Sequence, residues 1–136
     1  QSIEDLKTKN LRFINRQAGS GTRILLDYKL KMLGLSPSDI QGYGDDEYTH
    51  MSVAVAVLSG RADIGLGIMA AARALNLDFV PVVTEEYDLV IPEKFFLSKK
   101  VQLLLETIQS TEFKNRVSAL GGYDTQHTGM EVYSSK

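Results

Sequence analysis

The stretch of this sequence best suited to bind a charged small molecule is a glycine-rich turn flanked by arginines. It reads Asn-Arg-Gln-Ala-Gly-Ser-Gly-Thr-Arg over residues 15–23. The glycines let the backbone turn and approach a ligand closely, the serine and threonine add hydroxyl groups, and the arginines add fixed positive charge. A helix that begins in this turn would also present its first amides to a ligand, which suits an oxyanion or a carboxylate. The candidate ligand-binding residues here are Arg16, Gly19, Ser20, Gly21, Thr22 and Arg23.

A second candidate lies at Thr49 and His50, where another helix is expected to begin after a loop. Its first amides could meet the same ligand and form a second wall of the site. Each of these two patterns also has a purely structural interpretation. The first could be a capped turn with two surface arginines, because Gly-Ser turns are common before helices. The second could be an ordinary threonine cap followed by an exposed histidine, and taken alone it favours that interpretation.

Other motifs point away from catalysis. Residues 65–70, Gly-Leu-Gly-Ile-Met-Ala, imitate a dinucleotide-binding fingerprint, but we interpret them mainly as tight packing between a strand, a turn and a helix. No nucleophile elbow surrounds Ser20, and no phosphate-binding P-loop is present in the sequence. The acidic run 45–47 with His50 could hold a cation, although adjacent acids in a polar loop are usually solvated. We therefore expect no catalytic residue, no metal ligand and no cofactor.

The elements that position these residues follow an alternating pattern of short strands and helices. Such alternation predicts a mostly parallel sheet covered by helices on both faces, which is a three-layer α/β/α arrangement. In such sheets, ligands bind at the carboxyl ends of the strands, where helices begin. The expected strands cover residues 11–15, 40–43, 62–68, 79–84 and 87–91. The expected helices cover residues 2–7, capped by Ser2, then 22–33, 49–58, 69–75, 99–109 and 111–120.

Composition limits the class of protein. The 136 residues fit one domain over 1–136, and the hydrophobic share of 43% is enough for a packed core. The tail, residues 122–136, has no periodicity and is expected to be extended or disordered. A net charge of −2 gives no basic face for nucleic acid, and the absence of cysteine removes disulfides and thiolate sites. No stretch approaches the roughly 18 consecutive apolar residues of a membrane span.

Taken together, these stretches resemble the substrate-binding-like domain, often described as LysR-type, that bacteria and archaea fuse to MoeA-type molybdopterin-biosynthesis proteins or to helix-turn-helix regulators. The resemblance covers nearly the whole chain. It rests on residues 13–28, 47–50, 59–68, 71–75, 87–92 and 120–125.

The resemblance implies a type 2 periplasmic-binding-protein fold, in which two α/β lobes close on a ligand. This chain resembles the second lobe, so a first lobe is expected upstream. The implied function is non-catalytic binding or sensing of a small anion, such as molybdate, tungstate or a carboxylate, linked to molybdenum cofactor biosynthesis or to transcriptional regulation. The implied partners are a fused or neighbouring biosynthetic or helix-turn-helix domain and a second copy of the chain, in the cytoplasm or, alternatively, in the periplasm.

Some molybdate-binding relatives have a tyrosine just after the strand that matches residues 64–68. Here Met69 follows, and this departure counts against molybdate. Two alternatives stay open beside anion binding. One is an interaction domain that binds no ligand, and the other is a nucleotide-binding enzyme domain that uses residues 65–70.

Overall fold

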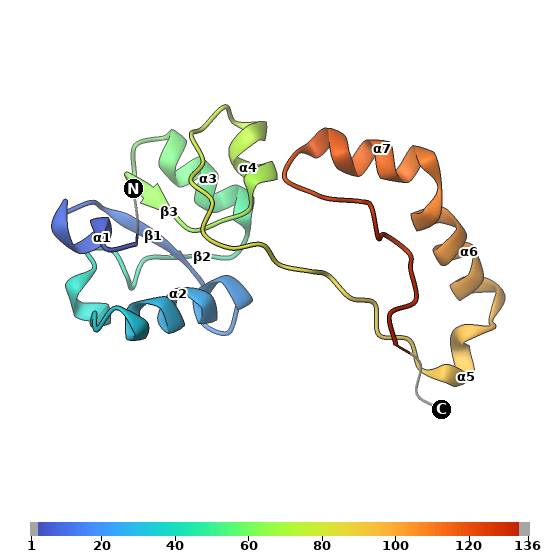
Figure 1. Cartoon of the computed structure of the whole chain (residues 1–136). Coiled ribbons are helices and arrows are strands. Elements are labelled where there is room, and N and C mark those ends of the chain that lie inside the picture. The colour runs from blue at the N-terminus through green and yellow to red at the C-terminus, as the bar shows by residue number, and fades with distance from the viewer. Residues whose placement is uncertain (1–2, 134–136) are drawn as a thin grey trace. The chain divides into compact units, whose positions relative to one another are not determined.

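The computed structural model of the chain describes residues 3–133, and the chain divides into two compact units, Gln1–Val82 and Val83–Lys136. The first unit contains a sheet and helices, and the second contains helices and extended segments (Figure 1). The expected cap at Ser2 and residues 134–136 of the expected tail lie outside the described residues. None of the helices in the described part of the chain is long and apolar enough to cross a membrane.

The sheet of the first unit has three parallel strands in the order β2-β1-β3. β1 (Phe13–Arg16) lies in the centre, between β2 (Asp46–Glu47) and β3 (Ile64–Gly65). Every residue of β1 is buried, as expected of a central strand that is covered on both faces. The parallel α/β architecture expected from the alternating pattern is thus confirmed.

Adjacent residues of β1 point to opposite faces of the sheet and build two separate cores. Phe13 packs with Leu6 of α1 (Asp5–Thr8), with Leu26 and Leu30 of α2 (Gly21–Met32), and with Ile40. Ile14 packs with Val53 and Ala56 of α3 (His50–Leu58) and with Ala62. α2 and α3 therefore cover different faces, which completes the three layers (Figure 1). The helices of this unit are α1 (Asp5–Thr8), α2 (Gly21–Met32), a 3₁₀ turn (Pro37–Asp39), α3 (His50–Leu58) and α4 (Met69–Ala74).

The strand expected at residues 40–43 is wrong, because the chain turns there instead. Gly42 has a φ of 86°, a left-handed conformation that ends any extended run. The pairing partner of β1 is the acidic stretch that was expected to be a solvated loop, with Asn15 opposite Asp46 and Arg16 opposite Glu47. Backbone pairing defines this edge strand, so its polar side chains give no sign of it.

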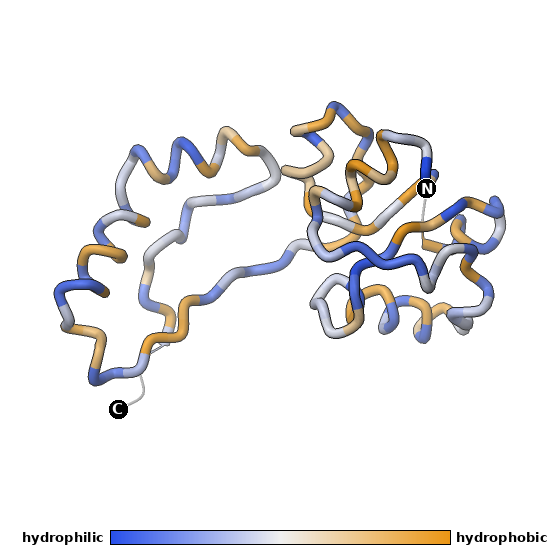
Figure 2. Tube along the Cα trace, turned by 180° about the vertical axis from the view of Figure 1, so that it is seen from behind, coloured by the Kyte–Doolittle hydropathy of each residue, from blue (hydrophilic) through white to orange (hydrophobic). Residues whose placement is uncertain are grey.

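The second unit contains α5 (Glu93–Phe96), α6 (Lys99–Gln109) and α7 (Thr111–Leu120). α6 and α7 confirm the helices expected over 99–109 and 111–120, and α5 was not expected. The strands expected at 79–84 and 87–91 are wrong, since these residues form neither helix nor strand. Their β-branched and apolar residues are visible as hydrophobic colour in Figure 2. A strand also needs a hydrogen-bonded neighbour, and no strand of the described chain pairs with this stretch.

Candidate functional site

The carboxyl ends of the three parallel strands lie at one edge of the sheet, and each leads into a helix. β1 leads through the glycine-rich turn to α2, β2 leads to α3, and β3 leads to α4. Because the strands are parallel, this edge brings the two candidate regions, residues 16–23 and residues 49–50, to the same end of the fold. α2 and α3 have 12 and 9 residues, long enough for their first amides to carry the partial positive charge of a helix start.

The glycine-rich turn leads into a capped helix start, as in the structural interpretation of this motif. Gly19 has a φ of 85°, and Ser20 caps α2 by accepting a hydrogen bond from the Arg23 amide at 3.2 Å. The amides of Gly21 and Thr22 precede the first internal hydrogen bond of the helix, as they do in any α-helix. These two amides remain available to an acceptor at the sheet edge.

Thr49 caps α3 through a reciprocal pair of hydrogen bonds. Its hydroxyl accepts from the Ser52 amide at 2.9 Å, and the Ser52 hydroxyl accepts from the Thr49 amide at 3.1 Å. The Thr49 side chain is therefore committed to the cap. His50 is the first residue of the helix and lies beside the turn after β3, where a Cβ added at Gly67 would be 3.7 Å from the His50 Nδ1 atom.

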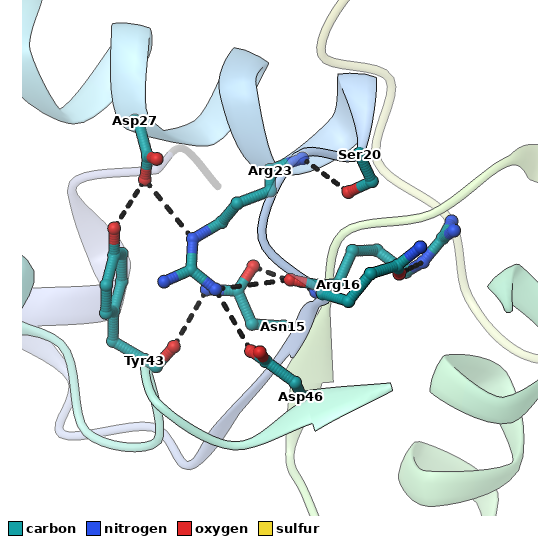
Figure 3. Close-up of polar contacts among 8 residues, drawn as sticks. Asn15, Arg16, Ser20, Arg23, Asp27, Tyr43 and Asp46 are labelled. Atoms are coloured by element: carbon teal, nitrogen blue, oxygen red, sulfur yellow. Dashed lines mark hydrogen bonds and ion pairs between the residues drawn. The ribbon is translucent and has the colours of Figure 1, made fainter. Parts of the chain in front are cut away.

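Arg23 is occupied by a network that ties α2 to the sheet (Figure 3). Its guanidinium lies 3.4 Å from Asp27 and 3.0 Å from Asp46, and it donates to the Arg16 carbonyl at 3.2 Å. The same group lies 3.9 Å from the centroid of the Tyr43 ring. Burial alone would lower the pKa of Arg23, but Tyr43 and the two carboxylates outweigh it and raise that pKa. Its charge is balanced within the protein, and its role in the structure is to hold elements together.

Arg16 is the contrasting case, with only 8% of its surface exposed and no acidic partner among the described residues. Its Nε donates to the Gln17 Oε1 atom at 3.2 Å, and its Nη2 donates to the Tyr48 carbonyl at 3.1 Å. Its Nη1 is buried and has no hydrogen-bond partner in the described chain. The facing carboxylate in the sheet register, Glu47, pairs with Arg61 instead. A buried N–H group without an acceptor is costly, by about 1–3 kcal/mol, so this atom is a strong indication of a missing acceptor.

Gln17 and Tyr48 are the site residues that the sequence analysis missed. Gln17 fixes one edge of the Arg16 guanidinium through its side chain, and Tyr48 fixes another through its backbone carbonyl. The position of Gln17 beside Arg16 was the only available signal for it. A backbone carbonyl leaves no trace in residue types, so the contribution of Tyr48 could not be read from the sequence.

The fingerprint at residues 65–70 serves packing, as interpreted from the sequence. A Cβ atom at Gly65 would overlap the side chains of Val53 and Ile14, so a larger residue there would force these core side chains to shift. α4 has only 6 residues and no side-chain cap. No group of three or more acidic or histidine residues in the described chain is arranged to hold a metal ion.

Residues 1–109 match the sequence profile described as the PBP superfamily domain. The chain belongs to the periplasmic-binding-protein (PBP) superfamily. This family consists of binding domains and is generally non-catalytic. The match agrees with the parallel α/β sheet.

Two relatives of this PBP-like chain have no established function. The chain is 43% identical over 135 residues to the uncharacterized protein YvgK of Bacillus subtilis, an alignment that covers 97% of this chain and 42% of YvgK. It is 36% identical over 110 residues to an uncharacterized protein from the 5′ region of the ferredoxin 2Fe-2S gene of Clostridium pasteurianum, covering 80% of this chain and 97% of that protein. No solved structure matches the chain significantly. The chain thus spans less than half the length of YvgK.

Proposed function

We propose that this PBP-like chain binds a small anion without catalysis, at the edge of the sheet where α2 and α3 begin. The observation that carries the proposal is the buried Arg16 guanidinium, whose Nη1 atom has no hydrogen-bond partner in the described chain. An anionic oxygen would supply the acceptor that this donor lacks and would balance the charge of the group. Arg16 is therefore the central binding residue, whereas Arg23 positions the helix.

The other donors at this edge support an anion in preference to a cation. The first amides of both helices, at Gly21, Thr22 and His50, carry the partial positive charge of a helix N-terminus. Glu47 and Asp46, the acidic residues of β2, are engaged by Arg61 and Arg23. With these carboxylates paired, the Arg16 Nη1 atom and the amides of Gly21 and Thr22 are donors that can meet an acceptor, which is the arrangement of an anion site.

Access to the central donor requires a local movement. The Nη1 atom lies beneath the surface, so an anion reaches it only when the side chains above it shift. Gln17 is one such group, because it is partly exposed and holds the Nε edge of the same guanidinium. We propose that binding includes a small rearrangement of Gln17.

The other lobe, the first lobe expected upstream, completes the site in this proposal. The sheet edge described here provides one wall, and PBP-type binding uses a ligand held between two lobes. The greater length of YvgK supports a longer protein in which a further region faces this wall. The biological setting follows the sequence resemblance, with a fused biosynthetic or helix-turn-helix domain and a link to molybdenum cofactor synthesis or transcription. Met69, the first residue of α4, stands where some molybdate-binding relatives have a tyrosine, and this departure counts against molybdate itself.

An interaction domain is the second candidate, and one specific observation favours it. Many large hydrophobic side chains of the second unit are exposed, including Val90, Leu97 and Leu103. Surfaces of this kind often mark contacts with other proteins.

The test of anion binding is a titration of the chain with molybdate, tungstate, sulfate, phosphate and dicarboxylates, followed by backbone amide NMR shifts. We expect at least one anion to shift the amides of Gly21, Thr22 and His50. The Arg16→Gln variant should weaken that binding about tenfold or more, because it removes the charged donor.

Arg73→Gln is the matched control, since Arg73 is exposed at the end of α4 and should leave binding unchanged. Equal affinity of the wild type and Arg16→Gln would disprove the proposed role of Arg16. Silence for the whole panel would leave the interaction domain as the better hypothesis.

A further inference from the structure

The extended stretch at the start of the second unit, residues 83–91, has backbone groups that pair with nothing in the described chain. These residues form neither helix nor strand, and none of them donates or accepts a backbone hydrogen bond within that part of the chain. Residues 83–90 are all exposed. An extended segment with unpaired N–H and C=O groups is a template for pairing with another chain.

The last five residues of this stretch have the side-chain pattern of a strand with one apolar face. In an extended backbone, alternate side chains point to opposite faces, so Tyr87, Leu89 and Ile91 share one face. Asp88 and Val90 share the other. Leu89 is 59% exposed and Tyr87 is 76% exposed, so this apolar face is uncovered.

The same five residues are complementary to a second copy of themselves. In an antiparallel pair centred on Leu89, Leu89 faces Leu89 and Tyr87 faces Ile91, which is the favourable combination of an aromatic with a β-branched side chain. On the other face, Asp88 lies opposite Val90, so no acidic residue faces another. Such a pair has two-fold symmetry, because each copy contributes the same patch.

Neighbouring registers are less favourable. A shift of one residue places the apolar set opposite Asp88 and Val90 of the other copy, which mixes the two faces. A shift of two residues in one direction places Asp88 opposite Asp88, and like charges directly opposite each other are destabilising. The opposite shift brings Pro92, which has no N–H group, into the ladder and Tyr87 opposite Glu93, where α5 begins.

The relative from Clostridium pasteurianum supports a second molecule as the partner. Its alignment spans 110 of the 136 residues of this chain and leaves out the other 26, so it includes residues 87–91 wherever it begins. The alignment covers 97% of that protein, which has almost no residues left for a further lobe. In a protein of that length, the partner of this stretch is another molecule.

From these observations we infer that two copies of the chain associate through residues 87–91, which form an antiparallel two-stranded ladder with its two-fold axis at Leu89. The inference goes beyond anion binding and does not depend on Arg16. A ladder of five residues from each copy is short, and a two-stranded ribbon is only marginally stable. We therefore expect a weak dimer, with a dissociation constant of about 10–100 µM.

The experiment is sedimentation equilibrium of the full chain at concentrations from about tenfold below to about tenfold above that constant. We expect a monomer that becomes a dimer as the concentration rises. Amide NMR spectra over the same series should show concentration-dependent shifts at residues 87–91. A chain that stays monomeric throughout, or that forms larger assemblies without a dimer, would overturn the inference.

Charge variants at the two-fold axis test the register. Leu89→Lys and Leu89→Glu should each weaken dimerisation about tenfold or more, because like charges would then face each other. An equal mixture of the two variants should restore a dimer, since Lys would face Glu. The matched control is Val90→Lys, which adds the same charge one residue further along, opposite the partner's Asp88, and should dimerise at least as well as the wild type.

Two results would contradict this register. One is a loss of dimer in Val90→Lys as large as that in Leu89→Lys, because the position of the charge would then not matter. The other is a mixture of Leu89→Lys and Leu89→Glu that stays monomeric although each variant has the circular dichroism spectrum of the wild type. Neither result would affect the anion titration, which reports on the first unit.

Discussion

The two units of this chain both carry large hydrophobic side chains, but only the first unit buries them. The first unit contains all the buried hydrophobic residues of the described chain, most of them in two cores around Phe13 and Ile14. In the described part of the second unit, Gly121 is the single buried residue. A hydrophobic pattern along the chain is therefore enough to indicate a helix. Burial of the hydrophobic side chains also requires a second element whose apolar face packs against that helix. A central strand supplies that face in the first unit.

The largest expected effect comes from removing core volume in the first unit. Leu26→Ala should lower the free energy of unfolding by about 3–4 kcal/mol, because Leu26 is fully buried in the core around Phe13 and its loss leaves a cavity. Leu104→Ala, at a 44% exposed position on α6, should cost less than about 1 kcal/mol. Urea unfolding followed by far-ultraviolet circular dichroism measures both. Similar losses at the two positions would show that α6 is buried in solution, and the contrast between the units would disappear.

A somewhat smaller effect is expected where the backbone of the first unit is most crowded. Gly42→Ala should destabilise the protein by about 2 kcal/mol, since the residue has a positive φ and an added Cβ would overlap the carbonyl oxygen of Phe13. Gly44→Ala is the matched control, because no atom would lie within 4 Å of its Cβ and its φ is ordinary. Thermal unfolding compares the two variants. An unchanged melting temperature for Gly42→Ala would mean that the turn before β2 is looser than described.

The smallest effect is a pH dependence in the first unit, at the ion pair that joins the start of β1 to the start of β3. Asp63 accepts hydrogen bonds from the side chain and the amide of Arg12, which lowers the Asp63 pKa to about 2. A carboxylate with a lowered pKa in the folded state stabilises the protein at pH values above its unfolded pKa of about 4. We expect that contribution to fade as the pH falls from about 4 to about 2.

The measurement is acid unfolding of the wild type and of Asp63→Asn. The variant should be less stable at neutral pH and should lose less stability across this acidic window. Asp88→Asn, at an exposed position in the second unit, should unfold like the wild type. A wild-type acid profile in Asp63→Asn would show that the pair contributes nothing in solution.

The features of the fold that the sequence predicted are those set by neighbouring residues along the chain. Helices begin after the glycine-rich turn and at Thr49 as expected, and α6 and α7 have the expected bounds, because helix starts and helical periodicity are local. β2 was missed because backbone pairing with β1 defines it, and its residues, Asp46 and Glu47, have poor strand preference. The strands expected at 79–84 and 87–91 were wrong for the reverse reason. Their residues prefer extended structure but have no pairing partner.

In the candidate site, too, the sequence did not predict what depends on contacts between distant parts of the chain. The sequence offered Arg16 and Arg23 as equivalent charges on either side of the turn. What separates them is the position of Asp46 and Tyr43, which come from another part of the chain and occupy Arg23. That choice depends on tertiary structure, so residue types and spacing could not rank the two arginines.

The two hydrogen bonds that hold the Arg16 guanidinium also determine what binding costs. A free arginine side chain has about 2 kcal/mol of rotamer entropy, which a flexible surface residue would lose on meeting an anion. Arg16 has already lost that freedom during folding, because its Nε and Nη2 atoms are fixed by Gln17 and Tyr48. The conformational entropy lost on association is therefore mainly that of the ligand and of the Gln17 side chain. A rigid ligand should bind with a smaller entropic penalty than a flexible one of the same charge.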